Sequence, residues 1–170
     1  MKRRTKPPED AFERLFMSEY GKVVAIAQRV LADRAEAEDV AQEVFLDFHR
    51  RHPADASYAS GWLHTAAVHT ALNRIRSRKR RERRELAEGR PATAVDDPQQ
   101  AVLAEEERRN VRAALARLPV KAASVLALRY SGLSYVEVGA ALGVGAGQVG
   151  TLLRRAETAL KKEMTRATPV

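Results

Sequence analysis

The sequence SYVEVGAALGVGAGQVGTLLRRAETALKK, residues 134–162, predicts two helices joined by a tight turn. Ser134 and Glu137 form a capping-box pattern at the start of the first helix, which we expect to end at Leu142. The turn Gly143-Val144-Gly145 follows, and apolar residues at three- and four-residue steps then predict a longer second helix. This order is typical of a helix–turn–helix, whose second helix lies in the major groove when the motif binds DNA.

The candidate DNA-reading surface lies on the second helix, which we expect to run from Ala146 to Met164. Glutamine pairs with adenine, and arginine pairs with guanine or phosphate. An αα-hairpin inside a helical core has the same pattern, so the pattern alone leaves both interpretations open. We expect no dinucleotide site at GAGQVG, residues 145–150, because that motif follows a strand and here a capped helix precedes it. The polar candidates are Gln148, Thr151, Arg154 and Arg155.

Two further helices and a linker are predicted upstream. Asp97-Pro98 has the pattern of an N-cap followed by proline, and Pro119 begins the next helix. The stretch LAEGRPATAVDDPQQ, which begins at Leu86, contains two prolines and little periodicity. We therefore expect an N-terminal domain at residues 8–86, a linker at 87–100 and a C-terminal domain at 101–168. An extended linker of this length spans up to about 50 Å, which would let the two domains contact different places on one long ligand.

The N-terminal block predicts three helices and no strand. Apolar residues between Phe12 and Leu31 recur at helical spacing. Asp33 and Glu36 have the pattern of a capping box for a second helix. A loop at residues 51–60 leads to a third helix that begins near Gly61. We expect an all-α chain, and its 170 residues are enough for one core or for two small ones.

The positive charge is concentrated in one segment. Lys and Arg number 30 against 22 Asp and Glu, a formal net charge of +8. Residues 74–84 hold eight Lys or Arg and one Glu, a net +7. Such runs are usually solvated faces, but eight like charges along one helix favour a polyanionic partner. By contrast, Asp39, Glu43 and Asp47 form an acidic stripe at four-residue spacing, which is either solvated or a docking face for a basic partner.

Several functional classes are excluded. The chain has no cysteine, so disulfide scaffolds and thiol chemistry are ruled out. No apolar run approaches the roughly 18 residues of a membrane span, and the basic start is not followed by the apolar segment of a secretory signal. His64 and His69 are five residues apart, which does not fit a helical metal site. We expect a cytoplasmic protein with no metal, no cofactor and no enzymatic activity.

Three stretches carry a resemblance to a known family. AEAEDVAQEVFLDFHR, residues 35–50, is followed by GWLHTAAVHTALNRIRSRKRR, residues 61–81, and then by the helix–turn–helix within residues 115–160. In this order they resemble regions 2.2, 2.3–2.4 and 4 of the extracytoplasmic-function (ECF) class of bacterial RNA polymerase sigma factors. The resemblance covers about residues 12–164. It implies two small helical domains, a region 2 bundle and a region 4 helix–turn–helix, joined by a flexible linker.

The resemblance implies an alternative sigma factor that binds core RNA polymerase and directs it to promoters. Region 2 would bind the β′ clamp and recognise the −10 element, with a flipped base beside the loop at residues 51–60. Region 4 would contact the β flap and read the −35 element, and an anti-sigma factor is a typical partner. The clamp contacts implied are Asp39, Gln42, Glu43 and Asp47. The −10 contacts implied are His52, Tyr58, Trp62, His69, Asn73, Arg76, Arg78, Lys79 and Arg80. The −35 contacts implied are Gln148, Thr151, Arg154 and Arg155.

The sequence departs from the family pattern at a few positions. His69 stands where asparagine is common and Asn73 where aspartate is common. Gly150 stands where lysine is common, and a glycine inside a helix costs about 1 kcal/mol relative to alanine. Two other hypotheses stay open on the residues alone: a standalone helix–turn–helix regulator, and a non-specific nucleic-acid-binding protein that acts through the basic segment.

Overall fold

Seven helices and no strand make up the part of the chain that the computed structural model describes, residues 8–89 and 99–167. This confirms the all-α fold class. The predicted cap at Asp97-Pro98 lies outside the described residues. The helices are α1 (Pro8–Leu31), α2 (Arg34–Arg51), α3 (Ala59–Ala87), α4 (Gln99–Arg117), α5 (Val120–Tyr130), α6 (Tyr135–Leu142) and α7 (Ala146–Ala167).

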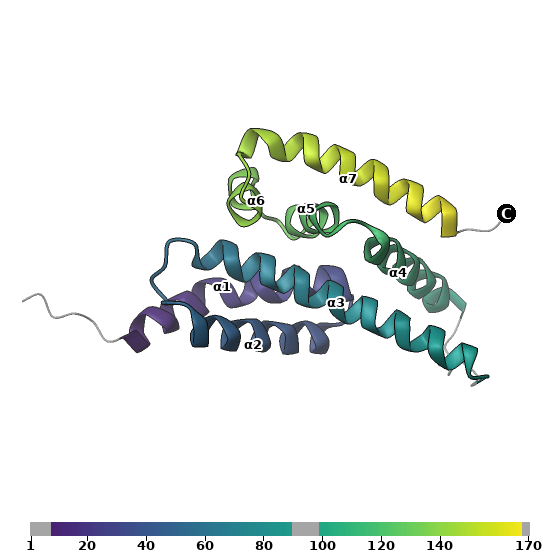
Figure 1. Ribbon diagram of the computed structural model, residues 1–170, viewed down its shortest axis with the longest axis horizontal. Helices are drawn as coiled ribbons and strands as arrows, with labels where there is room; N and C mark the ends of the chain where they lie inside the picture. The colour runs from purple at the N-terminus through teal and green to yellow at the C-terminus, as the bar shows by residue number, and fades with distance from the viewer. Residues whose placement is uncertain (1–7, 90–98, 168–170) are drawn as a thin grey trace, which may run out of the picture.

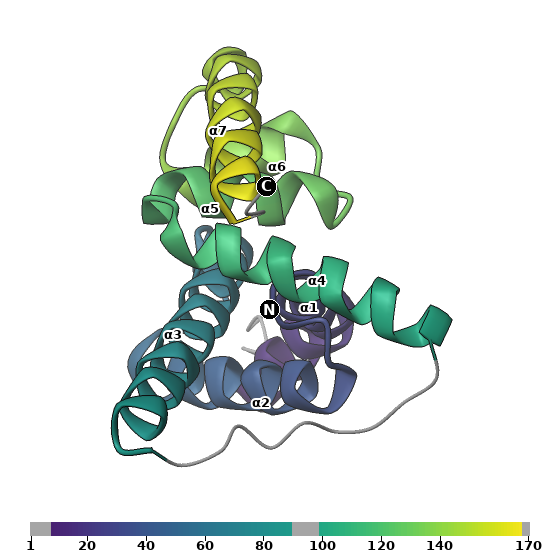
Figure 2. The ribbon, with the colours of Figure 1, turned by 90° about the vertical axis from the view of Figure 1, so that its right-hand side faces the viewer.

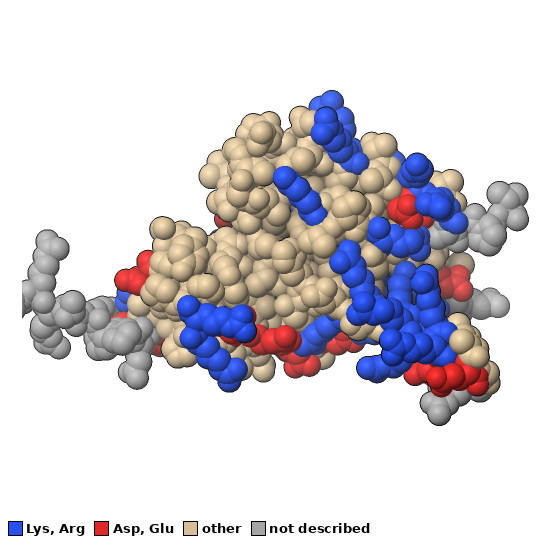
Figure 3. Space-filling view, viewed as in Figure 1, with Lys and Arg blue, Asp and Glu red and all other residues tan. Residues whose placement is uncertain are grey.

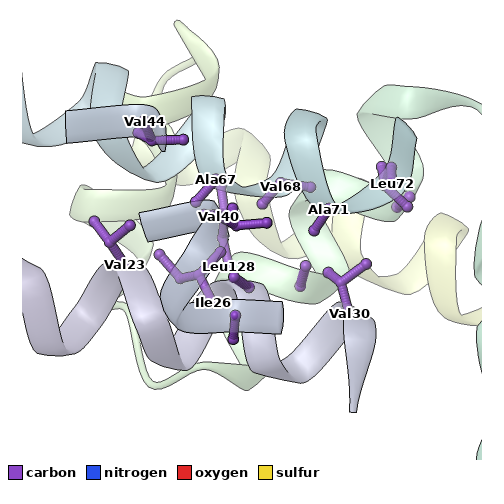
Figure 4. Close-up of a cluster of buried hydrophobic side chains, with 14 of the residues drawn as sticks. Val23, Ile26, Val30, Val40, Val44, Ala67, Val68, Ala71, Leu72 and Leu128 are labelled. Carbon is purple, nitrogen blue, oxygen red and sulfur yellow. The ribbon is translucent and has the colours of Figure 1, made fainter. Parts of the chain in front are cut away.

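Helices α1, α2 and α3 form a bundle in the N-terminal half (Figure 1). Val23, Ile26 and Val30 recur at helical spacing on one face of α1 and are fully buried. They face Val40 and Val44 of α2 in the close-up of the core (Figure 4). Burying a side chain of this size stabilises the fold by roughly 1.5–3 kcal/mol. The bundle therefore fixes which faces of α2 and α3 remain available to partners.

The predicted capping boxes are formed to different extents. At α6, Ser134 Oγ accepts from the Glu137 amide at 3.2 Å, and Glu137 Oε2 accepts from the Ser134 amide at 2.8 Å. At α2, Asp33 accepts from the Glu36 amide at 2.8 Å, so this half of the box is present. The carboxylate of Glu36 instead accepts from Arg78 Nη2 at 2.6 Å. The prediction of a capping box at α2 is therefore wrong in one half. Only the Asp33 cap forms, because Arg78, which is distant in the sequence, binds the Glu36 carboxylate.

Helices α4, α5 and α6 pack directly on the N-terminal bundle, and α7 packs on these three helices. Helix α4 crosses above α1 and α3, and α5 and α6 lie between α3 and α7 (Figures 1 and 2). Leu128 of α5 is fully buried in the same cluster as Val23 and Ile26 of α1 (Figure 4). The two halves thus share one core in this structure. The length of the linker had predicted two separate domains that could contact different places on one long ligand.

Small residues make this close packing possible. A Cβ built on Gly61 of α3 would lie 3.4 Å from the Ala140 carbonyl oxygen and 3.4 Å from Ala141 Cα of α6. One turn further along α3, Thr65 Oγ1 donates to the Ala141 carbonyl at 2.7 Å. The periodicity of the sequence gives no sign of this contact, because glycine, alanine and threonine do not stand out as an apolar stripe.

The helix–turn–helix has the predicted form. Gly143 ends α6 with φ 66°, the left-handed conformation that glycine adopts most readily. No single helix in residues 8–89 and 99–167 is long and apolar enough to cross a membrane. Helices α6 and α7 meet that measure only when taken together, and they are bent by 86° at their junction.

We expect Gly139→Ala to destabilise the protein. The added Cβ would lie 2.7 Å from the Val144 carbonyl oxygen, a backbone atom that can move only if the turn shifts. Overpacking of this kind costs about 1–3 kcal/mol, measurable as a lower free energy of unfolding in denaturant titrations. Gly147→Ala is the matched control, because no atom lies within 4 Å of its Cβ position. If both variants were equally stable, the close approach at Gly139 would be contradicted.

Candidate functional site

The outer face of α2 carries the predicted polymerase-binding residues. Because Val40 and Val44 turn into the bundle, Asp39, Gln42 and Glu43 are exposed on the opposite side. Acidic side chains accordingly line the edge of the molecule over α2 (Figure 3). The structure thus places this group together on one accessible helix face.

Two members of this acidic group are already paired within the chain. Glu43 Oε2 accepts from Arg74 Nη2 of α3 at 2.9 Å, and Asp47, which is half-buried, pairs with Arg51 at 2.8 Å. Exposed pairs of this kind contribute only about 0–1 kcal/mol, so a partner can exchange them at little cost. Asp39 makes no ion pair among the described residues and is the most available acid of the stripe.

Leu46 is a feature of this face that the sequence prediction missed. Its side chain is 53% exposed, although leucine is usually buried. It follows Asp39 and Gln42 at helical spacing, i, i+3 and i+7, so it lies on the same face. The sequence feature that could have revealed its exposure is its position outside the buried stripe of α2. An apolar side chain bordered by polar ones has the core-and-rim arrangement of a protein-binding surface.

An aromatic cluster fixes the segment between α2 and α3. The His52 ring stacks on Phe48 with centroids 5.1 Å apart and contacts Trp62 at 4.8 Å. Tyr58 Oη and His52 Nδ1 share a hydrogen bond of 3.3 Å. Tyr58 is 51% exposed, so its ring is accessible at the surface. The predicted residues His52, Tyr58 and Trp62 are therefore brought together.

A groove of about 450 Å³ connects this cluster with the middle of α3. Trp62, His69 and Asn73 line its α3 side, and Glu43 and Asp47 line its α2 side. The residues predicted for two different partners thus border one groove. Burial, and then the charge of Arg76, lower the pKa of His69 below its ordinary value. Its imidazole is therefore neutral at pH 7 and offers one donor and one acceptor.

The basic side chains of α3 contact different parts of the protein. Arg76 donates to the Ala116 and Leu118 carbonyls at 3.1 and 3.0 Å, and Lys79 donates to the Ala113 carbonyl at 3.1 Å. Arg78 pairs with Glu36 of α2, as described above. Arg80 is exposed and donates to the Ser77 hydroxyl at 3.0 Å.

A basic patch remains at the C-terminal end of α3 (Figure 3). Arg81, Arg83 and Arg84 are exposed there and make no ion pair within the described part of the chain. The positive surface available to a polyanion is therefore smaller than the composition of residues 74–84 suggests, and it lies toward the end of that segment.

The second helix of the helix–turn–helix presents a polar face to solvent. Thr151, Arg154 and Arg155 are exposed on α7, which lies on the far side of the molecule from α2 (Figures 1 and 2). Gln148 is exposed too, but its Oε1 accepts from the Gly145 amide at 3.2 Å. This contact stabilises the first turn of α7, so Gln148 must give up a cap to contact a base.

Gly150 lies beside the ring of Tyr135. Its Cβ position lies 3.6 Å from the ring of Tyr135, an ordinary van der Waals distance. A long side chain here would lie beside that ring, at the junction of α6 and α7. The packing of this junction therefore leaves room for a Cβ at residue 150, and the main effect of the glycine is to remove a side chain from the second helix of the motif.

The histidines do not form a metal site. His64 Nε2 and Glu19 Oε2 share a buried hydrogen bond of 2.7 Å, and the His49 ring packs on Phe12 with centroids 4.5 Å apart. In residues 8–89 and 99–167, no group of three His, Asp or Glu side chains is arranged to hold a metal ion.

Comparisons with known proteins match both halves of the chain. The family model for Sigma-70 region 2 matches residues 15–81, and the model for Sigma-70 region 4 matches residues 108–160. The RNA polymerase sigma-H factor of Pseudomonas aeruginosa is 30% identical over 91% of this chain and 86% of its own length. The RNA polymerase sigma factor YlaC of Bacillus subtilis is 31% identical over 93% of this chain and 94% of its own. The ECF RNA polymerase sigma factor SigW of Bacillus subtilis is 28% identical over 94% of this chain and 91% of its own.

A solved structure, the sigma factor RpoE in complex with the anti-sigma factor NepR from Bartonella quintana, aligns over 92% of this chain and 98% of that chain, with a TM-score of 0.48 and 19% identity. The two matched regions occur in the order that the sequence predicts, and the relatives are matched over most of their length. The chain therefore belongs to the sigma-70 family of RNA polymerase sigma factors, in its ECF class, and is an alternative sigma factor that directs RNA polymerase to promoters at transcription initiation.

Proposed function

We propose that this sigma factor divides its contacts between two surfaces. Residues 8–86 bind the β′ clamp of core polymerase and the −10 element, and residues 101–168 contact the β flap and read the −35 element. The observation that carries the proposal is the separation of the two polar faces, on α2 and on α7, at opposite sides of the molecule (Figure 1). A chain that joins a large enzyme to DNA needs at least two such surfaces.

The clamp contact is assigned to Asp39, Gln42 and Leu46. Leu46 supplies the apolar anchor, since it is the exposed leucine of this face. Asp39 and Gln42 supply polar contacts on the same side of the helix. Glu43 and Asp47 add contacts after exchanging Arg74 and Arg51 for groups of the polymerase. The mixed apolar and acidic composition favours a basic protein helix as the partner over DNA, which the acids would repel.

The −10 contact is assigned to the α3 side of the groove between α2 and α3. Trp62 and Tyr58 offer aromatic surface for stacking an unpaired base, and this stacking is worth about 1–3 kcal/mol per base. His69 and Asn73 border the same groove and offer hydrogen-bonding groups. The exposed end of α3, with Arg80, supplies phosphate contacts.

The −35 contact is assigned to the exposed face of α7. Thr151, Arg154 and Arg155 reach the major groove directly, and Gln148 contributes once its cap to Gly145 is released. We further propose that the protein acts in the cytoplasm, without catalytic groups or cofactors of its own, and that an anti-sigma factor regulates it. In vitro transcription with purified core polymerase and a pool of genomic promoters tests the whole proposal, which fails if no specific transcript forms.

We expect Leu46→Asp to weaken binding to core polymerase roughly tenfold or more, because loss of a central apolar anchor costs about 2 kcal/mol. Native co-purification or a titration with labelled core measures the change. Met17→Asp is the matched control, since Met17 is 77% exposed on α1, outside the proposed contact face. Equal losses in the two variants would show that Leu46 is not part of the docking surface.

We expect Arg154→Ala to lower transcription selectively on promoters that depend on the −35 element. A lost base contact costs about 1–3 kcal/mol, which corresponds to roughly a tenfold effect on recognition. Lys162→Ala, on the same helix and also exposed, should lower binding only slightly and to a similar degree on all sequences. Run-off transcription on matched promoters, with and without their −35 element, distinguishes the two outcomes. A uniform loss from Arg154→Ala would identify it as a phosphate contact.

A further inference from the structure

Two ion pairs border the groove between α2 and α3. Asp47 pairs with Arg51 at 2.8 Å, and Glu43 pairs with Arg74 of α3 at 2.9 Å. Asp47, Arg51 and Glu43 line the groove themselves, and Arg74 follows Asn73, which lines its α3 side. In each pair, an acid assigned to the polymerase contact therefore holds an arginine at the edge of the surface assigned to the −10 contact.

The side chains of Arg51 and Arg74 are accessible, at 69% and 33% exposure. An arginine uses the same fork of N–H donors for a carboxylate and for a phosphate, so an arginine that is paired with an acid has fewer donors left for DNA. The opposite charges of the pair also nearly cancel for an approaching phosphate. Neither arginine is among the residues that the family resemblance assigns to the promoter.

We propose, on the basis of the clamp and −10 contacts assigned above, that core polymerase releases Arg51 and Arg74 when it binds Asp47 and Glu43, and that both arginines then contact phosphates of the unpaired −10 strand. Each acid pairs with its arginine in the free protein and with a basic group of the polymerase in the holoenzyme. DNA binding in the groove therefore becomes stronger when the polymerase is bound.

The strength of the two ion pairs suits such an exchange. Exposed ion pairs are weak, and salt weakens them further, so a basic group of the polymerase displaces each arginine at little cost. Arg74 Nη1 also donates to the Glu36 carbonyl at 3.4 Å, which keeps the guanidinium in place during the exchange. Because the two binding free energies are linked, DNA strengthens polymerase binding by the same factor by which polymerase strengthens DNA binding.

Other charged residues of the same helices provide matched controls. Glu38 of α2 also pairs with an arginine four residues away, Arg34, at 2.9 Å, but neither residue lines the groove. Arg80 of α3 is exposed and makes no ion pair within the described part of the chain. It is therefore available to phosphate with or without polymerase.

In the free full-length protein, we expect Asp47→Asn to strengthen binding of a single-stranded −10 oligonucleotide roughly threefold, because Arg51 is released. The log–log dependence of this affinity on salt should become steeper by about 0.7, the value for one added phosphate contact on a single strand. Glu43→Gln should act in the same way through Arg74. Glu38→Gln removes the same charge and should leave the salt slope unchanged.

Fluorescence anisotropy measures these affinities, and circular dichroism confirms that each variant is folded. The oligonucleotide carries the −10 sequence of a promoter that the transcription assay identifies. In the holoenzyme, we expect Arg51→Gln and Arg74→Gln each to weaken binding of this oligonucleotide roughly threefold, and to have less effect in the free protein. Arg80→Gln should weaken binding by the same factor in both forms.

The outcomes distinguish the release of the arginines from the sigma activity itself. An equal effect of Arg51→Gln in the free protein and in the holoenzyme, or an unchanged salt slope in Asp47→Asn, would overturn the release of Arg51. The same results for Arg74→Gln and Glu43→Gln would overturn it for Arg74. Transcription by the parent protein would continue in both cases. If the parent protein gave no specific transcript with core polymerase, the proposed function would fail, and the release of the arginines with it.

Discussion

The partition of α3 into three faces is the constraint on which the rest of the structure depends. Its apolar face, with Leu63, Ala67 and Ala71, is buried in the core. A second face, with Thr65, Arg76 and Lys79, contacts α4 and α6, and a third face borders the groove with α2. Because a helix repeats every 3.6 residues, neighbouring residues of α3 fall on different faces. Arg76 and Arg78 are two residues apart, yet one contacts α4 and the other contacts α2. The arginines of one continuous basic segment, residues 74–84, therefore contact different helices of the protein.

The ion pairs between α2 and α3 explain how a basic chain presents an acidic face. Arg74 and Arg78 pair with Glu43 and Glu36, so part of the positive charge of α3 is balanced by acids of α2. These pairs lie at the surface, where solvent and salt weaken them. They orient side chains more than they stabilise the fold. The net charge of the molecule is therefore a poor guide to any one surface, and the local pairing determines what each helix offers.

The parts of the fold that depend on local sequence were predicted well, and those that depend on distant contacts were not. The Ser134–Glu137 box formed as predicted, because both partners lie in one turn. The pattern at Asp33 and Glu36 looked equivalent, but Arg78, 42 residues away, takes the Glu36 carboxylate. The grouping of Asp39 and Glu43 followed from helical spacing, and the family resemblance added Gln42. Leu46 was missed because exposure is decided by what packs nearby, and the contacts of Arg76 and Lys79 were missed because main-chain acceptors have no sequence signature.

The contacts of Arg76 and Lys79 also determine which cations of α3 are open to a polyanion. A main-chain carbonyl is a neutral acceptor, and a phosphate is an ionised one whose hydrogen bonds to cations are roughly twice as strong. Given equal access, Arg76 and Lys79 therefore favour phosphate over the end of α4. Access is not equal in this structure, because the main-chain oxygens of α4 and of Leu118 already occupy both side chains. The basic surface open to a polyanion therefore lies further along α3, where Arg80, Arg81 and Arg84 are exposed.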